Sequence, residues 1–318
     1  PLCDVWDSYA WNLTYTEQSS ASFLSRTGSI TFSGNYAQID DVNLHYGSKT
    51  SVLPASLTMR AAQDIVLGKS YTLAPSSTGQ LDLYAGHDIY GTKLTESAIN
   101  FNLVMSNLNP DEVYGDHSDN ARSLASDIGY KQNFDLAVHE GDTDPASIVA
   151  GNDIYDISLF IPKAATLSAG NDILNVDYVG LNLSASDQTL IMAGNNISYV
   201  AAFGQTSESL GITLHGPGTT TVLAGSSIDL GTSSGIRSMG TSSAVNLGTD
   251  PNNLIVAAGF DYTDALSLDS LKAFFTGDEE VQALAGIVTL EEDGSLTWDQ
   301  ADLERLIAEN LIPESWFE

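Results

Sequence analysis

The chain has 318 residues, with 41 Asp and Glu against 11 Lys and Arg, so its formal net charge is −30. Such a charge repels phosphate backbones and anionic membrane surfaces, which argues against nucleic-acid binding and polybasic membrane docking. Only 16% of the residues are charged and 42% are hydrophobic, which is typical of a folded chain rather than a disordered acidic tail. Cys3 is the single cysteine, so we expect neither an intrachain disulfide nor a Cys-based zinc site.

The start of the chain carries no recognisable targeting segment. No apolar run approaches the roughly 18 residues of a membrane span. The first residue is Pro1, and no basic stretch followed by an apolar stretch marks a signal peptide. We therefore expect a fragment or a processed product, with any export signal upstream.

A short pattern recurs along the chain: an apolar pair, Ala-Gly, a polar residue, Asp or Asn, and Ile. Its glycine, replaced by alanine in the first copy, falls at Ala62, Gly86, Gly151, Gly170, Gly194, Gly225 and, in a degenerate copy, Gly259. Gaps of 19 and 24 residues are too short for a helical hairpin repeat but fit three short strands and three turns. Apolar and polar residues alternate around each mark, as in short strands with one buried face.

These observations predict an all-β chain folded as a right-handed parallel β-helix. Residues 1–58 are predicted to form strands leading into the solenoid, and residues 59–265 the solenoid itself. The long gap between Gly86 and Gly151 is predicted to hold one or two additional coils and a polar insertion around residues 106–147. The isoleucines of the pattern should form a buried ladder, made of Ile65, Ile89, Ile154, Ile173, Ile197 and Ile228.

The composition changes near Leu266. Leu and Ala then recur at helical spacing in Leu266–Phe275, Glu279–Leu284 and Gln300–Leu311, with Asp or Ser near the starts. Residues 266–318 are therefore predicted to be a helical segment that covers the exposed edge of the last coil.

Residues 215–259 resemble the C-terminal region of the very large filamentous-haemagglutinin-type exoproteins. The resemblance rests on Gly216-Pro217-Gly218, Leu223-Ala224-Gly225, residues 228–233 (IDLGTS), Gly235-Ile236 and the closing residues 256–259 (VAAG). It implies a β-helical passenger at the surface of a Gram-negative bacterium, exported through an outer-membrane partner transporter and acting in adhesion or aggregation. It brings no catalytic residues to this chain, and the N-terminal secretion domain of such passengers is not in this sequence.

Stacking the repeats predicts a column of polar side chains, Asp64, Asp88, Asp153, Asp172 and Asn196, continued by Ser227 and Asp261. Stacked carboxylates about 4.8 Å apart repel each other, and a hard cation such as Ca²⁺ is one remedy. The alternative is a structural turn column, in which each side chain caps the backbone of its own corner. The neutral Asn196 and Ser227, and the absence of a GGxGxD signature, favour the turn column.

The insertion holds a second acidic group. Asp111, Glu112, Asp116 and Asp119, with His117 among them, are candidate ligands for a divalent metal such as calcium. Further candidates follow at His139, Glu140, Asp142 and Asp144. The alternative is an ordinary solvated loop. No other cofactor is expected.

The sequence contains no nucleophile elbow, P-loop or zinc motif, so the chain is not expected to be an enzyme. We expect a secreted or cell-surface protein that acts in adhesion, aggregation or extracellular structure. Its partners would be a receptor or glycan on a host or neighbouring cell, or further copies of itself. Two alternatives stay open: a carbohydrate-active β-helix enzyme, and a self-assembling fibre or sheath subunit.

Overall fold

The computed structural model describes residues 15–32, 51–68, 71–91, 102–110, 136–200, 210–240 and 252–259, and the backbone of residues 288–290 and 296–298. The chain divides into two compact units, Pro1–Gly259 and Phe260–Glu318. Among the described residues, no helix is long and apolar enough to cross a membrane.

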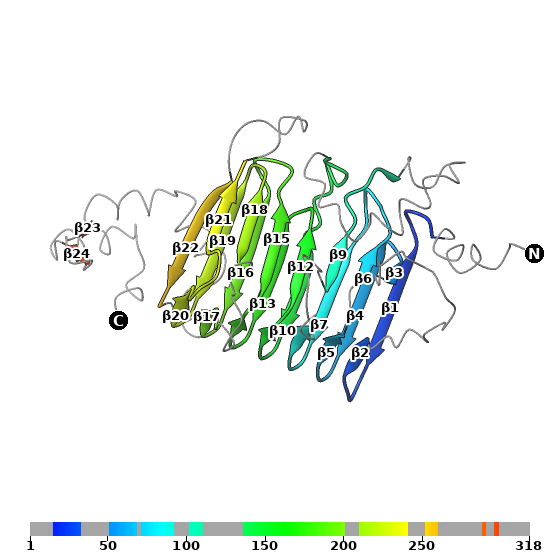
Figure 1. Cartoon of the computed structure of the whole chain (residues 1–318), viewed down its shortest axis with the longest axis horizontal. Coiled ribbons are helices and arrows are strands. Elements are labelled where there is room, and N and C mark those ends of the chain that lie inside the picture. The colour runs from blue at the N-terminus through cyan, green and yellow to red at the C-terminus, as the bar shows by residue number, and fades with distance from the viewer. Residues whose placement is uncertain are drawn as a thin grey trace, which may run out of the picture. The chain divides into compact units, whose positions relative to one another are not determined.

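The first unit is built of three long parallel sheets (Figure 1). Sheet A contains every third strand of the chain: β1 (Ser20–Ser25), β4 (Ser56–Ala61), β7 (Leu81–Ala85), β10 (Ala146–Ala150), β13 (Ala165–Ala169), β16 (Gln188–Ala193), β19 (Thr219–Ala224) and β22 (Asn253–Ala258).

The other two sheets take the strands between these. Sheet B consists of β2 (Ile30–Phe32), β5 (Ile65–Leu67), β8 (Ile89–Gly91), β11 (Ile154–Tyr155), β14 (Ile173–Leu174), β17 (Asn196–Ser198) and β20 (Ser227–Asp229). Sheet C consists of β3 (Ser51–Leu53), β6 (Tyr71–Leu73), β9 (Leu103–Met105), β12 (Ser158–Ile161), β15 (Asp177–Leu181), β18 (Ile212–His215) and β21 (Ile236–Met239).

Three successive strands therefore make one coil, with one strand in each sheet. Each strand pairs in parallel with the equivalent strand of the next coil, as in the register Ala150↔Ala169 and Ile154↔Ile173. This arrangement confirms the predicted parallel β-helix. The strands β1, β2 and β3 form a complete first coil upstream of Met59.

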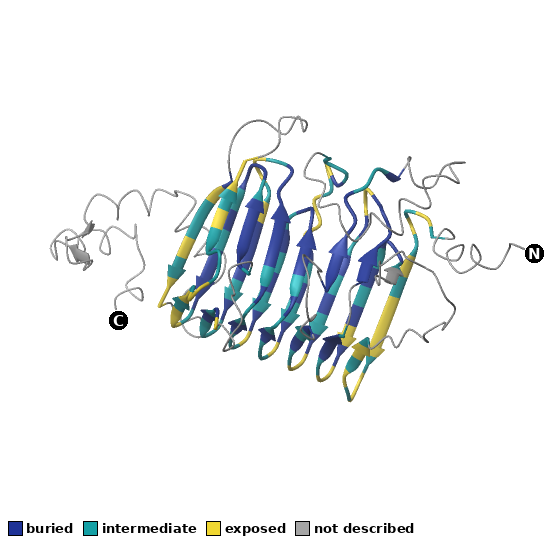
Figure 2. Ribbon diagram, viewed as in Figure 1, coloured by how far each residue is buried: buried dark blue, intermediate teal, exposed yellow. Residues whose placement is uncertain are grey.

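The core lies inside the coils, where like residues stack on like. Of the predicted ladder, Ile65, Ile89, Ile154, Ile173 and Ile197 are at most 1% exposed. Ile228, nearer the end, is only half-buried, and Ile30 extends the ladder at the other end. The predicted buried ladder is confirmed for five of its six isoleucines, and burial is most complete in the central coils (Figure 2). Each buried aliphatic side chain removed from water contributes about 1.5–3 kcal/mol, so stability accumulates coil by coil.

The prediction of additional coils between Gly86 and Gly151 is wrong. Strand β7 pairs directly with β10, and β8 pairs directly with β11. The extra length lies instead in two connections of a single coil, residues 92–102 between β8 and β9 and residues 106–145 between β9 and β10.

The second unit is described only by a short antiparallel pair, β23 (Val288–Leu290) and β24 (Leu296–Trp298). The sequence analysis did not anticipate these strands. The three stretches predicted to be helical, and their capping role, lie outside the described residues.

Candidate functional site

The recurring pattern occupies the corner between sheets A and B. From the second to the seventh coil, the buried alanine that ends the inner face of the sheet A strand and the isoleucine of the sheet B strand are separated by three residues. From the third coil on, the glycine comes first, and its N–H donates to the carbonyl of the preceding coil's alanine, as Gly170 does to Ala150 at 3.0 Å. A Cβ on Gly170 would overlap the backbone of Gly151 below it. Glycine is needed here because two backbones approach closely.

The polar side chains of this corner connect one coil to the next. Asp88 Oδ1 accepts hydrogen bonds from the backbone N–H of Asp153 at 3.0 Å and from the side-chain amide of Asn152 at 2.8 Å. Asp153 Oδ1 accepts in the same way from Asp172 and Asn171. Further along, Asp172 Oδ1 accepts from the backbone and side chain of Asn196, and Asn196 Oδ1 accepts from Ser227. The last predicted member, Asp261, lies outside the described residues.

This geometry differs from a turn that caps its own corner. Each of these carboxylates accepts a hydrogen bond from a backbone N–H of the following coil. That N–H lies at the start of the sheet B strand and takes no part in the backbone hydrogen bonds of the sheet. Ionised carboxylates form strong hydrogen bonds to such donors, which offsets the repulsion between stacked charges. Hydrogen bonding between coils therefore gives each of these carboxylates its donors.

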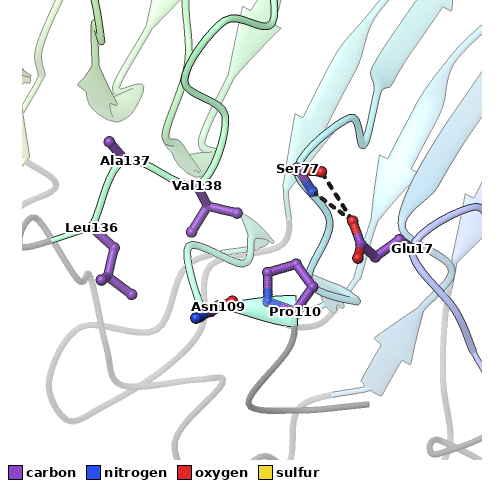
Figure 3. A pocket seen from close by; sticks show the side chains of 7 residues that line it. All are labelled: Glu17, Ser77, Asn109, Pro110, Leu136, Ala137 and Val138. Atoms are coloured by element: carbon purple, nitrogen blue, oxygen red, sulfur yellow. Dashed lines mark hydrogen bonds between the residues drawn. The ribbon is translucent and has the colours of Figure 1, made fainter. Parts of the chain in front are cut away.

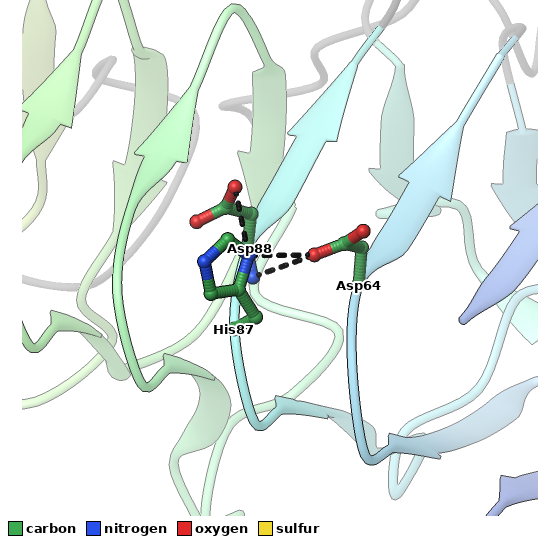
Figure 4. Close-up of side chains that lie close together, drawn as sticks. All are labelled: Asp64, His87 and Asp88. Carbon is green, nitrogen blue, oxygen red and sulfur yellow. Dashed lines mark hydrogen bonds and ion pairs between the residues drawn. The ribbon is translucent and has the colours of Figure 1, made fainter. Parts of the chain in front are cut away.

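His87 replaces the asparagine amide at one corner (Figure 4). Its Nδ1 lies 3.0 Å from Asp64 Oδ1 and 3.2 Å from Asp88 Oδ2. The hydrogen bond to Asp64 and the charge of Asp88 raise the pKa of His87. Partial burial opposes ionisation of Asp64, but hydrogen bonds from His87, the Asp88 backbone and Ser29 outweigh it and lower the pKa of Asp64.

The calcium ligands predicted in the insertion, Asp111, Glu112, Asp116 and Asp119, lie outside the described residues, as does His117. Downstream, Asp142 forms a buried ion pair with Lys163, whose side chain is 2% exposed. Burial opposes ionisation of Asp142, but hydrogen bonds from His139 and Lys163 outweigh it and lower the pKa of Asp142 to about 2.

The Asp142 cluster is closed to solvent. His139 is also 2% exposed, and burial lowers the pKa of its imidazole, with the charge of Lys163 acting in the same direction. Lys163 Nζ also donates to Gln80 Oε1 at 2.9 Å. Gln80 Nε2 in turn donates to the carbonyl of Pro145 at 2.8 Å, which fastens the connection that precedes β10 to the neighbouring coil. Because its charged groups are paired and buried, this cluster serves structure rather than substrate binding.

A pocket of about 320 Å³ opens beside the insertion (Figure 3). Its described lining mixes apolar side chains, including Pro110, Leu136 and Val138, with the polar Ser77 and Asn109. Its one carboxylate there, Glu17, accepts hydrogen bonds from the side chain and backbone of Ser77 at 2.9 and 3.4 Å. The described lining therefore offers no pair of carboxylates for general acid–base chemistry.

A second, shorter column, not predicted from the sequence, lies at the corner between sheets B and C. Asp156 and Asn175 have positive φ angles of 48° and 51°, a conformation that Asp and Asn adopt more readily than most residues. Asn175 donates to Asp156 Oδ1 at 3.0 Å and accepts from the backbone of Val200 at 2.8 Å. The signal was present, because each residue follows a corner Asp by three positions.

Tyrosines gather on the outer faces of the sheets. Tyr90 and Tyr155, on adjacent strands of sheet B, stack with ring centroids 4.7 Å apart and an interplanar angle of 7°. On sheet A, the guanidinium of Arg60 lies 4.6 Å from the ring centre of Tyr84. Aromatic side chains that are partly exposed on a rigid sheet are well suited to binding a partner.

Comparison with protein-family models, with curated proteins and with solved structures finds no match to this chain.

Proposed function

We propose that the chain is a non-enzymatic, β-helical part of an extracellular or cell-surface protein of a Gram-negative bacterium, acting in adhesion, and that its partner is a cell-surface glycan. Export through an outer-membrane partner transporter belongs to the same proposal. The resemblance of residues 215–259 to filamentous-haemagglutinin-type exoproteins supports the location and the export route.

The observation that carries the proposal is a difference between the side chains at the corners and those on the outer faces of the sheets. The recurring polar side chains of the corner form hydrogen bonds between coils, as Asp88 and Asp153 do. The outer faces carry partly exposed aromatic side chains, including the stacked pair Tyr90 and Tyr155. Tyrosine rings present a flat apolar face and a polar hydroxyl, the combination that suits a sugar ring.

Binding of the purified full chain to a glycan array tests the proposal. We expect saturable binding that falls more than tenfold in the double variant Tyr90→Ala, Tyr155→Ala. The matched control is Leu174→Ala, which lies in the same outward column one coil further on and should keep full binding. Failure of the parent chain to bind any glycan, or its cleavage of a polysaccharide, would refute the proposal.

A second candidate function is self-assembly into a fibre. Strands β1 and β22 are the edges of sheet A, and each has six residues. Phe23 and Val256 continue the same inward column at opposite ends and are 38% and 45% exposed. Unpaired edges template further pairing, and head-to-tail contact makes an open filament. Sedimentation across a range of concentrations tests this, because assembly predicts growing species whose formation Val256→Lys prevents.

A further inference from the structure

The corner where His87 stands differs chemically from its neighbours. In the next two coils the residue before the corner Asp is Asn152 or Asn171, and its amide donates to the carboxylate of the coil below. At His87 the same position carries an imidazole, which can also bind a metal ion through its lone pair. The amide nitrogen of Asn lacks that capacity.

Three potential ligand atoms converge at this corner (Figure 4). His87 Nδ1 is 3.0 Å from Asp64 Oδ1 and 3.2 Å from Asp88 Oδ2. Each of the three residues offers a ligand atom within 4.8 Å of those of the other two. Zn²⁺ binds imidazole nitrogen and carboxylate oxygen at about 2.0–2.2 Å, which places neighbouring ligands roughly 3.0–3.5 Å apart. The two distances to the imidazole already fall in that range.

Other contacts hold both carboxylates in place. The second oxygen of Asp64 accepts from the hydroxyl of Ser29 at 3.2 Å. Asp88 Oδ1 is fixed by the backbone of Asp153 and the side chain of Asn152, which leaves Oδ2 directed toward the imidazole. Hydrogen bonds of this kind orient metal ligands and raise affinity, so little rearrangement is needed on binding.

The site is also accessible. The side chain of His87 is 55% exposed, against 28% for Asp64 and 13% for Asp88. Solvent can therefore supply the remaining ligands of an ion held by three protein atoms. Two ionised carboxylates balance the charge of a divalent cation.

We propose that Asp64, His87 and Asp88 form a surface binding site for a divalent first-row transition metal, with Zn²⁺ as the representative ion. The mixed nitrogen and oxygen set favours such an ion over Ca²⁺, which takes six to eight oxygen ligands. Because Asp64 belongs to the second coil and His87 and Asp88 to the third, a bound ion links two neighbouring coils.

Calorimetric titration of the metal-free full chain with Zn²⁺ tests the proposal. Other acidic and histidine residues of the chain can bind Zn²⁺ too, so the readout is the difference between variants. His87→Asn copies the neighbouring corners, keeps a donor for Asp64 and should fold like the parent, as circular dichroism would show. It should lose one equivalent of Zn²⁺ or bind it more than about tenfold more weakly.

The reciprocal variant, Asn152→His, places an imidazole between Asp88 and Asp153 and should gain one equivalent. A thermal melt adds a second readout: Zn²⁺ should raise the melting temperature of the parent more than that of His87→Asn, and equimolar Ca²⁺ should not reproduce the difference. Equal stoichiometry and affinity in the parent and in His87→Asn would overturn the proposal, and so would loss of the Zn²⁺ signal in equimolar Ca²⁺.

Discussion

The three corners of the coil differ in how much their length varies from one coil to the next. The corner between sheets A and B, the first corner, is nearly constant, and the other two are not. From the second coil to the seventh, the first corner keeps three residues between alanine and isoleucine. The corner between sheets C and A ranges from the two residues that join β3 to β4 to the whole of residues 106–145. The corner between sheets B and C varies as well, from two residues after β11 to residues 33–50 between β2 and β3.

Hydrogen bonding explains the difference. At the first corner the backbone pairs with the neighbouring coil almost without interruption: in the fifth coil, Gly170 N–H donates to Ala150, Asn171 N–H to Asn152, and Asp172 N–H to the Asp153 carboxylate. An inserted residue would break this series in two coils at once. A corner without such a series can lengthen at the small entropic cost of a longer loop.

The largest effect on stability should come from a charge placed in the isoleucine ladder, which directly follows the first corner. Ile173→Asp puts an unpaired carboxylate at a site that is 1% exposed, and we expect a loss of about 4 kcal/mol or more, measured by urea unfolding. Leu174→Asp is the matched control, because the next side chain in β14 faces outward and is only half-buried. Equal losses in both variants would contradict the assignment of inner and outer faces.

An added methyl group should destabilise the first corner almost as much, and a corner with open space hardly at all. In Gly170→Ala the new Cβ meets the backbone carbonyl of Gly151, which cannot move without disturbing two coils, so we expect a loss of about 2–4 kcal/mol. Gly240, which follows β21, has open space around its Cβ position, and Gly240→Ala should change stability by less than about 1 kcal/mol. A stable Gly170→Ala variant would mean that the first corner is looser than its hydrogen bonds indicate.

The features of the fold that repeat from coil to coil could be predicted from the sequence. The spacing of the glycine marks identified the β-helix, and the position of the isoleucines after them identified the ladder. The sequence did not reveal from which N–H group each carboxylate accepts a hydrogen bond. An Asp such as Asp153 suits both alternatives, since it can cap its own corner or accept from the next coil. The sequence also could not pair Lys163 with Asp142, since that contact depends on how a long connection returns to the sheet.

The long gap before Gly151 was misinterpreted for a related reason. Every other gap between marks corresponds to one coil, so a long gap suggested missing coils. Because the two variable corners accept loops at little cost, length alone does not count coils. Direct pairing of β7 with β10 was the information that the sequence lacked.

A half-buried carboxyl at the start of β15 should make stability depend on pH. Burial raises the pKa of Asp177 from 3.8 to about 7, against weaker opposing effects of the Gly211 backbone and Arg237. Between these values the folded chain holds a proton that the unfolded chain releases, so the free energy of unfolding falls as pH rises from about 4 to 7. We expect this fall, on the order of 2–4 kcal/mol, to disappear in Asp177→Asn. Parallel pH profiles for parent and variant, from urea unfolding, would contradict it.

The smallest effect should come from the polar column itself, and it separates hydrogen bonding from charge. Asp153→Ala leaves the N–H of Asp172 and the amide of Asn171 without their acceptor, and we expect a loss of about 1–2 kcal/mol. Asp153→Asn keeps an acceptor oxygen but removes the charge, so it weakens these bonds and at the same time relieves repulsion from the stacked Asp88 and Asp172. Its loss should be less than half that of the alanine variant, as measured by urea unfolding at low ionic strength. If the asparagine variant loses as much as the alanine variant, the charge of Asp153 is itself required, and a cation shared along the column would become the better explanation.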